Sequence, residues 1–358
     1  MIKRGFRLGY SVCLGCTAAV DGAYGNRVEG SAAADVAGSM HGFPAALTSF
    51  VGRAAVADEI CGQLGEYRLV TVTGPGGAGK TRLAGEVARQ VVGRFADGVW
   101  LAELAAVRDP AQVAPAVAAA LGIRELPSVA AADALARTLA RRQLLLVLDN
   151  CEHVIGAAAE LCGRLLLGAD DVRVLATSRE PLRIGGEVRY RLAPLTLPDP
   201  DNPADPEASE AVALFTDRAR RADASFALDG ETAPAVARLV ARLDGMPLAI
   251  ELAAARVEAL GVTQLLDRID DRFTLLEAGD RLAAARQRSL AATVEWSYRL
   301  LDERERRVFR AVSVFPGPFT LEGAEAVAGL APGRLRCTWW TARCWSRRGP
   351  VRTAGTGM

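Results

Sequence analysis

The chain has 358 residues, of which 50% are hydrophobic and 24% are charged, a composition typical of globular proteins. Its formal net charge is +1, so overall charge gives no reason to expect a nucleic-acid or membrane partner. No apolar run reaches the roughly 18 residues that a membrane-spanning helix needs, and the length favours two or three domains.

Residues 1–43 are rich in Gly, Ala and Ser and show no sustained periodicity, so we expect a disordered or mis-assigned leader there. The N-terminus only faintly resembles a secretory signal peptide, because polar residues and glycines interrupt its apolar stretch. Cys13 and Cys16 form a lone C-x-x-C motif without a second pair at zinc spacing, which predicts neither a metal nor a redox role. Cys151 and Cys162 fall in apolar stretches, and we expect reduced core cysteines.

The strongest motif is a phosphate-binding loop, or P-loop, at residues 74–81. Its sequence Gly-Pro-Gly-Gly-Ala-Gly-Lys-Thr matches the pattern G-x-x-x-x-G-K-[ST]. A β-branched strand is predicted at 68–73 and a helix at 80–92, which is the context that this motif requires. The chain has only two lysines, and Lys80 of this motif is one of them. A compact ammonium at this position favours a nucleotide site over a plain glycine-rich turn.

The loop also predicts how a nucleotide would be held. Backbone N–H groups, turned inward by the glycines, surround a phosphate, and the start of the following helix adds partial positive charge. Lys80 would reach the β- and γ-phosphates, and the Thr81 hydroxyl would hold Mg²⁺. The predicted nucleotide-binding residues of the loop are Gly74, Gly76, Gly77, Gly79, Lys80 and Thr81. Because an ATP site makes little sense outside the cell, we expect a cytoplasmic protein.

Strand and helix patterns alternate as far as residue 192. Further strands are predicted at 98–104, 143–149, 172–177 and 188–192. Ala-rich helices are predicted between them at 110–121, 129–141 and 155–167. Continuous apolar strands that alternate with helices predict an α/β fold, with a buried and mostly parallel sheet covered by helices on both faces.

A second acidic group for the site is expected at the end of another strand. Five apolar residues, 144–148, precede Asp149, which emerges where ligands bind in open α/β sheets. The Asp149 carboxylate would orient Mg²⁺ and its waters, although a polar residue that merely ends a strand is the alternative. Because the strand 98–104 lies between the two motifs in sequence, the P-loop strand and the Asp149 strand are not expected to be neighbours in the sheet.

Two further residues are candidates for catalysis beside Asp149. Asn150 occupies the position where many ATPases carry a second acid, and an amide cannot accept a proton at neutral pH. Glu152 lies two residues further and is the candidate base; otherwise the site has no strong base. In either case the sequence predicts slow ATP hydrolysis. Arg179 ends the fourth strand at the same sheet edge, where its guanidinium would contact a γ-phosphate and report its presence. The alternative is a surface arginine that pairs with Glu180.

The second half of the chain reads differently. Residues 194–207 carry clustered prolines and aspartates, which predicts a linker. Helices are then predicted at 208–224, 231–244, 247–259 and 263–270, and three short helices in 288–329. The tail 334–358 has six arginines, no acid and three tryptophans, with no periodicity. Such a mixture can bind nucleic acid or membranes, but a shift of reading frame turns part of it into an ordinary strand, which favours an out-of-frame tail.

Taken in order, five blocks of the sequence resemble the signature blocks of STAND ATPases with an NB-ARC-type core. They are Phe50-Val-Gly-Arg53, the P-loop, Leu148-Asp-Asn-Cys-Glu-His153, Thr177-Ser-Arg-Glu180 and Gly245-Met-Pro-Leu-Ala-Ile-Glu-Leu252. The chain is most similar to actinobacterial regulator ATPases, which are often fused to LuxR-type or SARP-type DNA-binding domains. The resemblance covers about 44–330.

The resemblance implies further roles. Val51 and Arg53 would lie near the adenine, and Pro247 would pack on the base or ribose from the helical domain, in addition to starting a helix. Trp296 would lie in the core of a partial winged-helix domain that packs on the nucleotide domain. The implied organisation is a leader at 1–43, a P-loop domain at 44–193, a linker at 194–207, a helical domain at 208–287, a partial winged-helix domain at 288–333 and a tail at 334–358.

The predicted function is a switch that binds ATP or ADP, with Mg²⁺, and acts as the regulatory ATPase core of a transcriptional regulator. The expected partners are the nucleotide and either a second copy or a regulatory protein, with DNA bound only through domains that this chain lacks. The family's later histidine-containing motif is absent, so the chain looks truncated. Three alternatives stay open: a DNA-binding regulator acting through 288–358, a P-loop enzyme that transfers phosphate to a small molecule, and a nonfunctional truncated ATPase.

Overall fold

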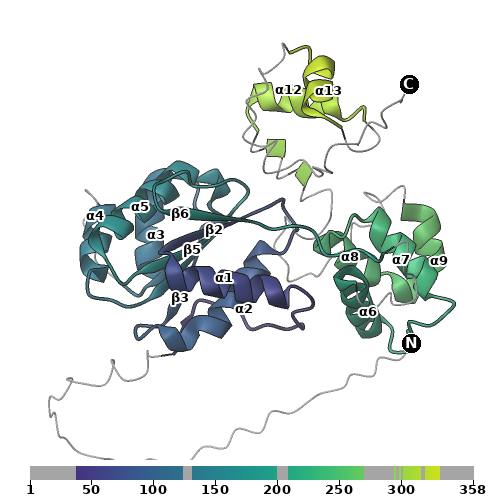
Figure 1. Ribbon diagram of the computed structural model, residues 1–358, viewed down its shortest axis with the longest axis horizontal. Helices are drawn as coiled ribbons and strands as arrows, with labels where there is room; N and C mark the ends of the chain where they lie inside the picture. The colour runs from purple at the N-terminus through teal and green to yellow at the C-terminus, as the bar shows by residue number, and fades with distance from the viewer. Residues whose placement is uncertain are drawn as a thin grey trace, which may run out of the picture. The chain divides into compact units, whose positions relative to one another are not determined.

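Figure 1 shows the computed structural model of the chain. The structure describes residues 38–123, 131–199, 209–269, 294–295, 298–299, 301–315 and 319–330. Within these ranges the predicted α/β fold is confirmed: a parallel sheet carries helices on both faces, and helices follow it from residue 210 onward (Figure 1). The predictions made for 1–37, for Trp296 and for the tail 334–358 lie outside the described residues.

The described part of the chain forms one sheet of six strands, in the order β1-β3-β4-β5-β2-β6. The strands are β1 Met40–His41, β2 Leu69–Thr73, β3 Val99–Glu103, β4 Leu145–Asp149, β5 Arg173–Ser178 and β6 Glu187–Arg191. Every neighbouring pair is parallel. Strand β5 lies between β2 and β4, so the P-loop strand and the Asp149 strand are not neighbours, as predicted from their order in the sequence.

Strand β1 is not predicted by the sequence pattern, because it has only two residues and lies within the expected leader. The backbone N–H of Val99 donates to the carbonyl oxygen of Ser39 at 2.9 Å. The ring of His41 stacks on that of Trp100, with 3.8 Å between ring centroids. These contacts come from β3, so the signal for β1 is tertiary and not local.

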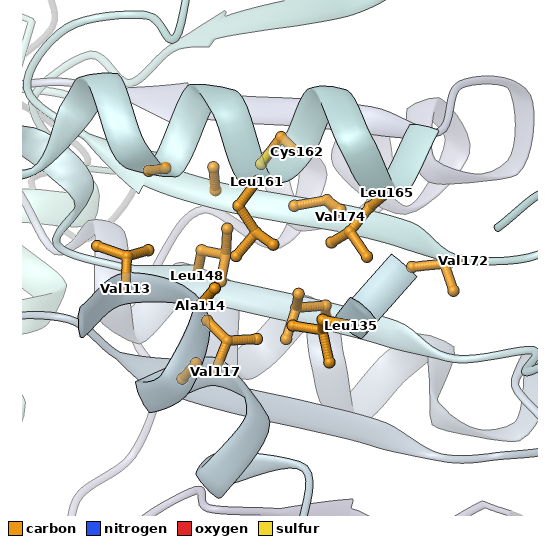
Figure 2. Packing of buried hydrophobic residues seen from close by; sticks show 14 of the residues in the cluster. Val113, Ala114, Val117, Leu135, Leu148, Leu161, Cys162, Leu165, Val172 and Val174 are labelled. Atoms are coloured by element: carbon orange, nitrogen blue, oxygen red, sulfur yellow. The ribbon is translucent and has the colours of Figure 1, made fainter. Parts of the chain in front are cut away.

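The alternation of side chains along the strands divides the core into two layers. Leu146 and Leu148 of β4 point into one hydrophobic cluster, whereas Leu145 and Val147 point into another on the opposite face. The first layer is covered by α3 Val113–Ala120, α4 Ala131–Leu139 and α5 Ile155–Gly168, and the second by α1 Ala54–Glu66 and α2 Lys80–Val91. Figure 2 shows side chains of α3, α4 and α5 converging around Leu148. Three short 3₁₀ helices complete this domain: η1 Val92–Arg94, η2 Pro110–Gln112 and η3 Cys151–His153.

A second group of helices has its own hydrophobic core. It consists of α6 Glu210–Ala222, α7 Ala233–Arg242, α8 Pro247–Ala254 and α9 Val257–Arg268. The predicted helix 247–259 ends earlier than expected, because α8 ends at Ala254 and α9 begins at Val257; within α9, Gly261 has a non-helical φ of +66° that kinks the chain. Glycine adopts this conformation without strain, and the helical backbone is interrupted here, at the point where the sequence pattern predicted a break.

Two helices are described in the last part of the chain, α12 Glu303–Val312 and α13 Leu321–Val327. The Asp302 carboxylate accepts from the backbone N–H of Glu305 at 2.7 Å and so caps the start of α12. A small core that includes Val308 and Ala324 joins the two helices. The winged-helix assignment stays a prediction. None of the described helices combines the length and the apolar character needed to cross a membrane.

Candidate functional site

A cavity of about 500 Å³ lies at the carboxyl ends of β2, β4 and β5. Its lining comes from the segment 43–53, from the P-loop and from helices α6 and α8. The predicted site residues that line it are Val51, Arg53, Gly76, Gly77, Gly79, Lys80, Thr81, Asp149, Glu152, Arg179 and Pro247. Gly74 lies at the end of β2, where its N–H donates to the carbonyl of Ser178. Residues that are far apart in sequence are thus gathered around one space.

The P-loop turns sharply between β2 and α2. Gly77 and Gly79 have φ values of +79° and +87°, in the left-handed region that glycine adopts without strain. The Lys80 ammonium donates to the carbonyl oxygens of Gly74 and Pro75, at 2.9 and 3.0 Å, and only 9% of Lys80 is exposed. The cation therefore lies inside the loop, where a phosphate would offer it a stronger acceptor.

Asp149 is the centre of a buried hydrogen-bond network. The Thr81 hydroxyl donates to its Oδ1 and Oδ2 atoms at 2.8 and 3.0 Å. The Thr177 hydroxyl donates to Oδ1 and the Asn150 amide donates to Oδ2, each at 2.5 Å. Burial raises the pKa of the Asp149 carboxyl, and the hydrogen bonds from Thr177 and Thr81 partly oppose this rise. Thr177 is a member of the site that sequence reasoning missed, since its contact with Asp149 depends on how β4 and β5 align; Asn150 instead contacts its own neighbour in the chain.

The oxygen atoms of Thr81 and Asp149 fit Mg²⁺, the metal that the P-loop implies. Mg²⁺ prefers oxygen ligands and is often held by one or two carboxylates together with substrate phosphates and waters. Within the described ranges, no three His, Cys, Asp or Glu side chains come together in a way that could hold a metal ion. The Thr81 hydroxyl and the buried Asp149 carboxylate, at hydrogen-bond distance from each other, are therefore a pair of oxygen ligands beside the P-loop that could hold this metal.

Arg179 and Glu152 form a buried ion pair at the same sheet edge. The Arg179 Nε atom lies 3.0 Å from Glu152 Oε1, and each side chain is only 5% exposed. This burial rules out the alternative of a surface arginine. Among the described residues, the other carboxylate oxygen of Glu152 is buried without a hydrogen-bond partner. A buried acceptor without a partner is unfavourable, so a water or a ligand hydroxyl at this point would stabilise it.

Arg53 reaches the P-loop from the segment that precedes α1. Its guanidinium donates to the carbonyl oxygens of Ala78 and Ala193, at 2.5 and 2.7 Å. Its backbone N–H donates to Glu210 Oε1 of α6, also at 2.5 Å. Burial lowers the pKa of Arg53 to about 10, so the guanidinium is still charged at neutral pH. The Arg53 guanidinium thus contacts protein backbone at the cavity, and its own backbone N–H contacts the helical domain.

Helix α8 contacts the P-loop directly. Pro247 is its first residue, and the N–H of Leu248 donates to the carbonyl oxygen of Gly77 at 3.2 Å. A Cβ atom on Gly77 would lie 3.1 Å from the Cβ atom of Leu248, so a glycine is needed for this close approach. Val51 packs against the core of the helical domain. Sequence reasoning missed Leu248, because an apolar residue in the first turn of a helix gives no signal of such a contact.

A cluster of charged side chains, Arg82, Arg218 and Glu251, also lines the cavity, and the sequence analysis did not predict it. Arg218 Nε of α6 lies 3.0 Å from Glu251 Oε1 of α8, and Arg82 Nη1 of α2 lies 3.8 Å from the same oxygen. Arg82 donates to the carbonyl oxygen of Thr48 at 2.7 Å, and Arg218 donates to that of Ser49 at 3.1 Å. One carboxylate thus connects the helix that follows the P-loop with two helices of the helical domain.

Comparison with known proteins places these features in a family. Residues 63–180 match the AAA domain family. The chain is 40% identical over 281 residues to an uncharacterized protein of Mycobacterium tuberculosis. The aligned region covers 78% of this chain and 69% of that protein. It is 41% identical over 265 residues to a protein of the same organism whose name describes an HTH-type transcriptional regulator, covering 74% of this chain and 29% of that protein.

A solved structure of a STAND protein with a tetratricopeptide repeat sensor, from Pyrococcus horikoshii, is also similar, with 17% identity and a TM-score of 0.40. The matched region covers 81% of this chain and 38% of the Pyrococcus horikoshii chain. The predicted resemblance to regulator ATPases is confirmed by the AAA-domain match and by the relative named as an HTH-type transcriptional regulator. The chain therefore contains an AAA domain and belongs to the same family as the uncharacterized Mycobacterium tuberculosis protein.

Proposed function

We propose that this protein is a switch controlled by ATP and ADP. The observation that carries the proposal is that one cavity is lined both by the P-loop and by helices α6 and α8. A nucleotide in this cavity would touch the α/β domain and the helical domain together. ATP and ADP would then favour different arrangements of the two domains, because a ligand shifts an equilibrium by its difference in affinity for the two states.

In this proposal the α/β domain binds the phosphates and the metal. Lys80 and the N–H groups of the P-loop bind the phosphates, and Val51 and Pro247 contact the base or ribose. Thr81 and Asp149 hold Mg²⁺, which neutralises phosphate charge when it is bound. The hydrogen bonds that Asp149 accepts from Thr177 and Asn150 support this role, because they orient the carboxylate toward Thr81.

Arg179 is proposed as the sensor of the γ-phosphate. Its guanidinium already lines the cavity and is paired with Glu152. A γ-phosphate would compete with this carboxylate for the same cation, so ATP and ADP would differ in their effect on the pair. While Glu152 holds Arg179, its carboxylate is a poor general base, which agrees with the proposal of slow ATP hydrolysis.

The switch is proposed to regulate transcription, and the protein is proposed to be cytoplasmic. The support is the match to an HTH-type regulator, of which this chain covers 29%. In such a protein this region would be the regulatory ATPase core, and contact with DNA would be made elsewhere. A second copy or a regulatory protein is the proposed partner that reads the domain arrangement.

The first test is the identity of the nucleotide that heat-denatured, purified protein releases. Near-stoichiometric ADP or ATP in the wild type, and none in Lys80→Ala prepared in the same way, is the expected result. If the wild type carries no nucleotide, and added ATP with Mg²⁺ does not bind, the proposal is wrong. Release of a different nucleotide would change the ligand but keep the P-loop assignment.

A further inference from the structure

Two consecutive carbonyl groups of the P-loop are held from outside the loop. The Gly77 carbonyl accepts from the N–H of Leu248, and the Ala78 carbonyl accepts from Arg53 Nη1. In a trans peptide the carbonyl of one residue and the N–H of the next point in opposite directions. Arg53 therefore fixes the direction of the Gly79 N–H, which is turned away from Arg53 at the start of α2, where phosphate is bound in P-loops.

Arg53 is itself held by the helical domain. Its backbone N–H donates to Glu210 Oε1, and the second oxygen of the same carboxylate accepts from the N–H of Thr196 at 3.2 Å. Gly52 allows this approach, because a Cβ atom there would lie 3.0 Å from the Cβ atom of Glu210. Arg53 also has a φ of +60°, an uncommon conformation that these contacts maintain.

We propose that Arg53 is a positioning residue that makes the shape of the P-loop depend on Glu210 of the helical domain. This inference rests on the proposed function, since it concerns nucleotide binding at that same loop. The planar fork of the guanidinium suits the role, because it holds the carbonyl groups of Ala78 and Ala193 at the same time. A lysine ammonium on a flexible chain would not hold both in a fixed geometry.

The coupling must act in both directions. If docking of the helical domain shapes the loop for phosphate, then phosphate binding stabilises the docked helical domain by the same factor. Among the described residues, Glu210 is not part of the cavity lining. A change at Glu210 can therefore alter nucleotide affinity only through the residues that it holds.

The experiment compares ADP affinity, measured by calorimetry, in full-length Glu210→Ala, Glu210→Gln and Arg53→Lys. Glu210→Ala and Arg53→Lys are expected to weaken ADP binding roughly 10-fold, within the usual range of coupling between sites. Glu210→Gln keeps an acceptor for the Arg53 N–H and should restore most of the affinity. Glu258→Ala is the matched control, because Glu258 is an exposed acid in the first turn of α9.

Hydrogen exchange gives the second readout. In the wild type, ADP should slow amide exchange in both the P-loop and the first turn of α8, whereas in Glu210→Ala the protection of α8 should be lost. Normal ADP affinity in Glu210→Ala, together with a loss in Arg53→Lys, would mean that Arg53 contacts the nucleotide itself, and the inference would fail. If the wild type binds no nucleotide, the proposed function fails first. Should Glu210→Ala not fold, Arg53→Lys and Glu210→Gln decide the question.

Discussion

The Thr81 hydroxyl donates to both carboxylate oxygens of Asp149 and so joins the P-loop helix to the end of β4, across the intervening strand β5. Strand pairing does not bring the two residues together, because β2, which leads into the P-loop, is not paired with β4. The contact arises because parallel strands end at one edge, where the loop after β2 folds back over β5. The contact places a hydroxyl and a carboxylate at hydrogen-bond distance from each other, and both groups can be ligands of Mg²⁺.

Removing the charge of Asp149 tests its part in metal binding. Asp149→Asn keeps the shape of the side chain but removes the carboxylate, so we expect Mg²⁺ to stop strengthening ATP binding. ADP binding without Mg²⁺ should change little. Calorimetric titrations of ATP and ADP, each with Mg²⁺ and with a chelator, measure both effects. An unchanged Mg²⁺ dependence in Asp149→Asn would show that the metal is held by other groups.

The difference in thermal stability between Asp149→Asn and the wild type should depend on pH. Because burial raises the pKa of Asp149 in the folded state, the folded protein binds this proton more tightly than the unfolded chain does. Stability from this group is therefore fully present below the unfolded pKa and is lost as pH rises through the folded pKa. Without Mg²⁺ and nucleotide, Asp149→Asn should melt at a higher temperature than the wild type at pH 7, and the difference should shrink toward pH 4. A difference that is constant with pH would contradict this origin.

Lys80 is expected to be required for nucleotide binding. Lys80→Ala removes a cation that lies inside the P-loop, and the loss of charged hydrogen bonds should weaken ADP binding by roughly 100-fold. Lys80→Arg keeps the charge, but its larger planar head would not fit the same space, so it should rescue little. Calorimetry measures the affinity, and thermal melting verifies that each variant is folded. Full ADP affinity in Lys80→Ala would overturn the P-loop assignment.

Much of this site can be predicted from the sequence, because its signals are local. The P-loop is a run of eight residues, and Asp149 follows five apolar residues directly. Glycines and a strand end need no tertiary information to be recognised. The α/β fold follows in the same way from strands and helices that alternate with clear periods.

The remaining contacts depend on how separate segments come together. Arg53 and Ala78 are 25 residues apart, and their hydrogen bond depends on a backbone at φ +60°. The bond from Thr177 to Asp149 depends on the alignment of β5 with β4. Glu251 lies in a helix whose apolar pattern says nothing about a charged neighbour on another domain. Strand register and domain docking carry this information, and no local motif does.

The pair of Arg179 and Glu152 should control the choice between ATP and ADP. Glu152→Gln weakens the hold on Arg179, so ATP should gain affinity relative to ADP. Arg179→Gln should remove most of the discrimination between the two nucleotides. The ratio of the two dissociation constants is the measurement, with the wild type as reference. Equal ratios in all three proteins would show that this pair is only structural.

Breaking this buried pair should also cost stability. Removing one partner leaves a buried charge without compensation, which typically costs about 3–5 kcal/mol, whereas replacing both by apolar residues costs much less. Arg179→Met is therefore expected to lower the free energy of unfolding more than Arg179→Met combined with Glu152→Leu. Denaturant unfolding of the single and double variants forms the test. Additive losses would mean that the two side chains are not energetically coupled.

Arg218 should hold the helical domain to the segment that precedes α1. It is buried and contacts Glu251 and the Ser49 backbone, whereas Arg220 on the same helix is exposed. Arg218→Gln should therefore lower the free energy of unfolding by about 2 kcal/mol, and Arg220→Gln by less than about 0.5 kcal/mol. Because Glu251 also faces Arg82 of α2, we further expect Arg218→Gln to speed the release of a fluorescent ADP analogue in stopped-flow measurements. Equal release rates in the two variants would mean that this charged cluster stabilises the fold without controlling the cavity.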